Sequence, residues 1–110
     1  MEGDYQILST IVPGKIKTNC YVIAIDEDAM ILSAGSLIKT IPLSLDILNN
    51  ADKFIENLNS KCLLYYEGMY CTNSKRPECD VVHETFNLKK VQSFKYGEAN
   101  YSLYRLNSNI

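Results

Sequence analysis

The chain has 110 residues, enough for one domain with a single core, and its 46% hydrophobic and 22% charged residues are typical of a globular protein. It has no apolar stretch as long as a membrane-spanning helix, and its N-terminus lacks the pattern of a signal peptide. We therefore expect an intracellular protein with no membrane partner. The net charge of −2 excludes the overall basic excess that an autonomous nucleic-acid-binding protein usually shows.

The first third of the chain predicts an antiparallel meander of three strands. Residues 15–26 form a long strand, polar at its start and buried on both faces towards its end. An acidic turn at 26–28 is followed by a second strand at 29–33, and a short turn containing glycine leads to a third strand at 37–44. Pro42 cannot donate to a sheet ladder, so the third strand ends there or lies at a sheet edge.

The apolar period then changes, and later returns to that of strands. Apolar residues within 44–61 recur at helical spacing and predict one amphipathic helix. A fourth strand at 61–71, a polar loop and a fifth strand at 79–94 follow. Gly68 lies inside the fourth strand, where a glycine indicates a bulge or a sharp bend that helps a small sheet to close.

This order of strands and helix resembles the OB-fold, so the expected fold class is all-β with one helix, arranged as a five-stranded Greek-key barrel. The features that carry the resemblance are Gly14 and Lys15 before a long first strand, the helix between strands three and four, and Gly68. Residues 1–94 are then an OB-fold domain with an N-terminal extension, and residues 95–110 are a C-terminal tail. A different small β-barrel and an α+β roll have the same element order and stay open.

The size, the nearly bare barrel and the segment YYEGMYC (residues 65–71) resemble the smallest subunits of two complexes, replication protein A and the CST telomere-capping complex. The resemblance implies a non-enzymatic subunit that binds a larger OB-fold protein. It also implies a location in the nucleus, on the chromosome at telomeres, and contact with single-stranded DNA that is weak or occurs only within the complex. Without the resemblance, the expected location is the cytoplasm. The alternatives are an autonomous single-stranded nucleic-acid-binding protein and a zinc-stabilised interaction module.

Two sets of residues are candidates for binding. The tail fits a helix slightly better than a strand and has no obvious internal place for its apolar residues, which predicts a docking face for the partner subunit. Its residues are Tyr101, Leu103, Tyr104 and Leu106. The candidates for nucleic-acid contact are basic residues on the third strand and in the loop after the fourth, namely Lys39, Lys75 and Arg76.

The sequence predicts no catalytic residues and no cofactor. It contains one histidine, His83, and no phosphate-binding or metalloprotease motif. The four cysteines are expected to be buried free thiols, because the chain lacks a secretion signal. Three of them, Cys62, Cys71 and Cys79, could join His83 at a zinc ion, but they lack the C-x2-4-C spacing of a zinc knuckle. Cys71 and Cys79 flank the predicted hairpin loop, a placement that permits a two-thiol contact or a disulfide.

Overall fold

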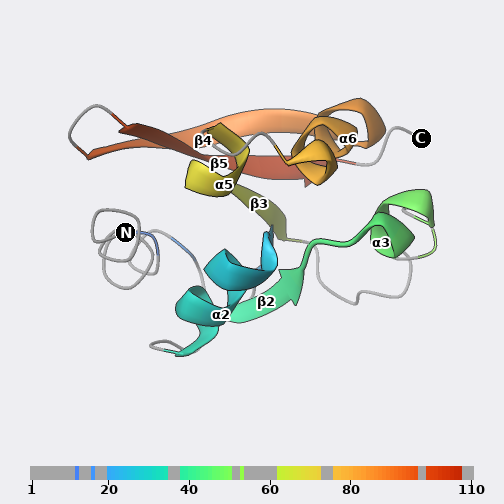
Figure 1. The fold of residues 1–110 in the computed structure, drawn as a ribbon, viewed down its shortest axis with the longest axis horizontal. Coiled ribbons are helices and arrows are strands. Elements are labelled where there is room, and N and C mark those ends of the chain that lie inside the picture. The colour runs from blue at the N-terminus through green and yellow to red at the C-terminus, as the bar shows by residue number, and fades with distance from the viewer. Residues whose placement is uncertain are drawn as a thin grey trace.

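The computed structural model describes residues 20–34, 38–50, 62–72, 76–96 and 99–107, together with positions 12, 16 and 53. These residues form one sheet with helices on both of its faces (Figure 1). The elements in chain order are β1 (Tyr21–Ala24), α2 (Asp26–Ala34), β2 (Lys39–Pro42), α3 (Leu45–Asn49), β3 (Leu63–Glu67), α5 (Met69–Thr72), α6 (Pro77–Thr85), β4 (Asn87–Tyr96) and β5 (Ala99–Asn107).

The sheet has five strands in the order β2-β1-β3-β5-β4. Strand β1 is parallel to both β2 and β3, whereas β5 is antiparallel to β3 and β4. The predicted antiparallel meander is therefore wrong. A five-stranded sheet is confirmed, but closure into an OB-fold barrel is not, because the described sheet is open, with β2 and β4 as its edges.

Helix α2 occupies the place of the predicted second strand, and this difference produces the parallel pairing. Asp26, Glu27 and Asp28 form its first turn, where negative charge stabilises the N-terminal end of a helix. Ala29 and Leu32 are three residues apart and both are buried against the sheet. A short apolar run does not distinguish a helix from a strand, and here the acidic residues that suggested a turn begin the helix.

The predicted fifth strand, residues 79–94, is half helix and half strand. Pro77 stands at the start of α6, a position where proline's fixed φ and missing N–H do not disturb a helix. The chain leaves the helix at Phe86 and continues directly as β4. The C-terminal tail is also different from the prediction, because residues 99–107 form strand β5 and not a helix.

Two clusters of apolar side chains form the core, one on each face of the sheet. On the face covered by α2, Val22, Leu64, Tyr66 and Leu103 pack together. On the face covered by α3 and α6, Ile23, Leu63, Tyr65 and Leu106 pack with residues of those helices. The adjacent Tyr65 and Tyr66 therefore point to opposite faces, as neighbours on a strand must.

All four cysteines form disulfides, so the expectation of free thiols is wrong. Cys20 and Cys62 directly precede the neighbouring strands β1 and β3 and join them. Because the bond spans 42 residues of sequence, it removes chain entropy worth about 4 kcal/mol from the unfolded state. The second bond, Cys71–Cys79, spans 8 residues and joins α5 to α6.

Gly68 directly follows β3 and does not form a bulge inside it. Its carbonyl accepts a hydrogen bond from the Cys71 amide as the chain turns into α5. A Cβ atom at this position would lie 2.7 Å from Cε2 and 2.9 Å from the hydroxyl oxygen of Tyr66, whose side chain is fully buried. The bulge of this sheet lies in β4 instead, between Lys90 and Gln92.

We predict that Gly68→Ala destabilises the fold by about 1–3 kcal/mol, because the buried Tyr66 ring cannot move away from the added methyl group. The melting temperature, followed by circular dichroism, measures this cost. The same substitution in a Tyr66→Leu background should cost less, because the crowded ring atoms are gone. An unchanged melting temperature in the Tyr66 background would contradict the close contact.

Candidate functional site

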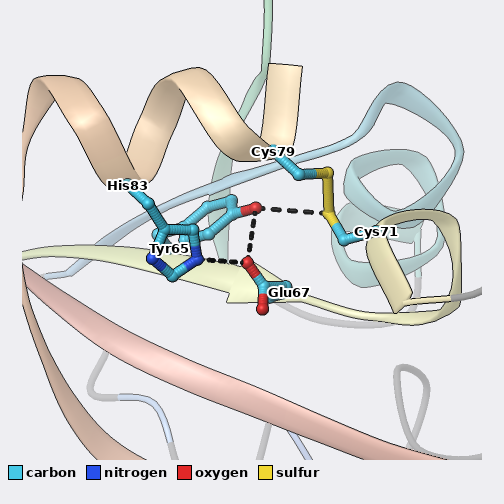
Figure 2. Close-up of polar contacts among 5 residues, drawn as sticks. All are labelled: Tyr65, Glu67, Cys71, Cys79 and His83. Atoms are coloured by element: carbon cyan, nitrogen blue, oxygen red, sulfur yellow. Dashed lines mark hydrogen bonds and ion pairs between the residues drawn. A yellow bond between two sulfur atoms is a disulfide. The ribbon is translucent and has the colours of Figure 1, made fainter. Parts of the chain in front are cut away.

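The polar residues at the carboxyl end of β3 form a connected cluster on the face covered by α6 (Figure 2). Tyr65 and Glu67 are two residues apart on the strand and project from this same face. His83 reaches them from the last turn of α6, and its Nε2 atom lies 2.6 Å from Oε2 of Glu67. The His83 side chain is 42% exposed and that of Glu67 is 17% exposed, so the pair lies at the protein surface.

Tyr65 lies buried beneath the His83–Glu67 pair and connects it to a disulfide. Its hydroxyl donates to Oε2 of Glu67 over 3.3 Å and lies 3.2 Å from the Sγ atom of Cys71 (Figure 2). Burial, with the nearby Glu67 carboxylate as a second cause, raises the pKa of Tyr65 well above its usual range. The hydroxyl therefore keeps its proton and can act as a hydrogen-bond donor at any physiological pH.

Tyr104 joins this cluster to the β4–β5 hairpin. Its ring stacks on Tyr65 with a centroid separation of 6.0 Å and meets His83 edge to face at 5.4 Å. The Nζ atom of Lys90 lies 5.8 Å from the centroid of the same ring. Burial, and then Glu67, raise the pKa of Tyr104 as well. The contacts with Tyr65, His83 and Lys90 together hold the Tyr104 ring in place.

The hairpin itself carries a concentration of positive charge. Lys89, Lys90 and Lys95 on β4 and Arg105 on β5 are all exposed, and neither strand contains an acidic residue. Lys89 stands directly opposite Arg105 in the strand register. Like charges that face each other across two strands destabilise a sheet, so this pair favours a bound anion.

The predicted nucleic-acid contacts lie elsewhere and have partners of their own. Lys39 is exposed at the start of the edge strand β2, with its Nζ atom 5.3 Å from the centroid of the Tyr21 ring. Arg76 forms an ion pair with Glu27 at 3.1 Å and lies over the Tyr70 ring. Lys75 lies outside the described residues.

The predicted docking residues belong to β5 and pack mostly inside the chain. Tyr101, Leu103 and Leu106 are buried, and Tyr104 is half-buried against Tyr65 and His83. The docking prediction depended on these residues having no internal place, and the structure shows that they do have one. The docking of a partner at this strand stays a prediction.

The pairing of His83 with Glu67 could not be read from the sequence. The two residues are 16 positions apart and belong to different elements, whereas Glu84 is the acidic neighbour in sequence. The zinc alternative loses its ligands, because the sulfurs of Cys62, Cys71 and Cys79 are bound in disulfides. Within the described ranges, no group of three or more His, Cys, Asp or Glu residues is placed to hold a metal ion.

No family model matches the sequence, and no curated protein or solved structure shows significant similarity to it. Among the helices in the described part of the chain, none combines the length and the apolar character needed to cross a membrane.

We predict that Tyr65→Phe reduces the loss of stability in alkali. In the folded chain Tyr65 keeps its proton above the pH at which the unfolded chain releases it, at about pH 10. Its contribution to stability is therefore complete below about pH 10 and is lost as the pH rises further. The free energy of unfolding is measured in urea for the unchanged chain and for Tyr65→Phe, at neutral pH and at about pH 11. Its decrease between the two pH values should be smaller for Tyr65→Phe. Equal decreases would contradict the raised pKa.

Proposed function

We propose that the chain is a non-enzymatic binding module that contacts single-stranded nucleic acid through the β4–β5 hairpin. The observation that carries this proposal is the concentration of cations on two strands that have no acidic residue, in a chain whose net charge is −2. The exposed cations are Lys89, Lys90, Lys95 and Arg105. Contacts of Lys and Arg with phosphates supply most of the affinity of non-specific nucleic-acid binding, so a local patch suffices in an acidic chain.

The arrangement of the cations supports a backbone contact. Lys89 and Arg105 face each other across the two strands, and in the described part of the chain neither forms an ion pair. A phosphate group between them would relieve their repulsion. Lys90 and Lys95 stand opposite Tyr104 and Asn100 in the register and therefore project from the other face of the hairpin, so this contact uses Lys89 and Arg105.

Base recognition has a smaller part in this proposal. The Tyr104 ring already packs against Tyr65, His83 and Lys90, so it is not free to stack on a base. With phosphate contacts as the main source of affinity, we expect little preference for sequence.

The larger OB-fold partner, the closed barrel and the telomeric or replication setting rest on the family resemblance alone and remain proposals. The open sheet provides the hairpin without a barrel, so nucleic-acid binding does not depend on closure. The two disulfides are typical of oxidising compartments and do not favour the nuclear location.

The test is the salt dependence of binding by the full chain to short labelled DNA and RNA single strands, measured by fluorescence anisotropy. The double variant Lys89→Gln, Arg105→Gln should bind more weakly, and its slope of log affinity against log salt should be smaller by about 1 to 2. The glutamine side chains are uncharged, so they no longer neutralise a phosphate group.

Lys39→Gln is the matched control, because Lys39 is also an exposed lysine on an edge strand. We expect its affinity and salt slope to match those of the unchanged chain. An effect of Lys39→Gln with none from the hairpin variant would return the interface to the residues predicted from the sequence. The absence of any salt-dependent binding by the full chain would contradict the proposal.

A further inference from the structure

The two cysteines of the Cys71–Cys79 disulfide differ in exposure. Cys71 lies in the short helix α5 and is half-buried, whereas Cys79 lies in the first turn of α6 and is only 4% exposed. A thiolate that approaches from solvent therefore reaches Cys71 first. Because thiol–disulfide exchange needs access to the attacked sulfur, this asymmetry assigns different roles to the two cysteines.

The sulfur of Cys71 also has a hydrogen-bonding partner in place. The Tyr65 hydroxyl lies 3.2 Å from Sγ of Cys71 and is also bound to Glu67, which in turn contacts His83 (Figure 2). While the disulfide is intact, the hydroxyl donates its hydrogen bond to the Glu67 carboxylate. When Cys71 becomes a thiolate, the same hydroxyl can donate to its sulfur, and a hydrogen bond to the charged form stabilises a thiolate.

We propose that Cys71–Cys79 is a thiol–disulfide exchange site for a dithiol partner, with Cys71 as the exchanging sulfur and Cys79 as the resolving cysteine. In the first step a partner thiolate attacks Sγ of Cys71. The bond to Cys79 breaks, a mixed disulfide forms, and Cys79 leaves as a thiolate that takes a proton from water. The second thiolate of the partner then attacks the partner sulfur of the mixed disulfide and releases Cys71 beside the Tyr65 hydroxyl.

The result is a two-electron reduction of the chain's disulfide and oxidation of the partner to its own disulfide. The reverse sequence reduces a disulfide of the partner. This inference is independent of nucleic-acid binding, because it uses none of the hairpin cations.

The other disulfide provides an internal contrast. Cys20 is 2% exposed and Cys62 is half-buried, so exposure alone does not distinguish this bond from Cys71–Cys79. The difference lies in its place in the fold, because Cys20–Cys62 joins the starts of two strands in the middle of the sheet. Its reduction removes a constraint between strands that pair side by side, whereas reduction of Cys71–Cys79 releases a constraint between α5 and α6.

The first experiment uses the intact chain and reduced glutathione as the probe. Thiols released at increasing glutathione concentration are alkylated and mapped by mass spectrometry, while circular dichroism monitors the fold. We expect Cys71 and Cys79 to be alkylated while Cys20–Cys62 remains oxidised and the fold is retained. Release of all four cysteines together, or only on unfolding, would overturn the proposal.

The second experiment separates the roles of the two sulfurs with the matched variants Cys71→Ser and Cys79→Ser. With glutathione disulfide as the probe, Cys71 in the Cys79→Ser chain should form the mixed disulfide at least about tenfold faster than Cys79 in the Cys71→Ser chain. Addition of Tyr65→Phe to Cys79→Ser should slow this reaction, which a purely structural tyrosine would not do. Equal rates in the two serine variants would overturn the assignment of roles, and the intact-chain experiment decides the proposal if either variant fails to fold.

Discussion

Strand β3 has a parallel neighbour on one side and an antiparallel neighbour on the other, and this position organises the rest of the structure. Its residues Leu63 to Tyr66 are all buried, so successive side chains enter the cores of opposite faces. Where the strand reaches the surface, Glu67 ends it, and Gly68 provides the space that the Tyr66 ring needs. The same strand thus fixes both cores and places Tyr65 beneath the polar cluster.

The two disulfides and the cationic β4–β5 hairpin are all placed relative to this strand. Cys20–Cys62 joins the residues directly before β1 and β3, and Cys71–Cys79 joins α5 to α6, the helix from which His83 meets Glu67 at the carboxyl end of β3. On the other side, β5 pairs with β3 and also with β4, so the hairpin that carries the cations is anchored to the core through β5. The Tyr104 ring connects the polar cluster to the hairpin, because it packs against Tyr65 and His83 and lies near Lys90.

Local patterns predicted the parts of the fold that depend on local chemistry. The strand signals around β1, β2 and β3 are confirmed, and β2 is an edge strand that ends at Pro42 as its missing N–H requires. The start of the predicted helix after Pro42 is confirmed as α3, and the rest of that segment lies outside the described residues.

The errors concern α2, α6 and β5. Acidic residues and proline also occur in turns and loops, so the first-turn acids of α2 and Pro77 of α6 do not by themselves indicate a helix. Strand β5 lacks a clean apolar face because both of its faces are covered. Contacts between distant residues, such as His83 with Glu67, follow from the parallel topology, which no single segment encodes.

The placement of β3 between β1 and β5 can be measured by backbone nuclear Overhauser effects in the labelled chain. We expect inter-strand contacts of the parallel type between the Val22 and Leu64 regions, and of the antiparallel type between Tyr65 and Tyr104. Antiparallel contacts between residues 21–24 and 29–33, the arrangement of a closed meander, would contradict it.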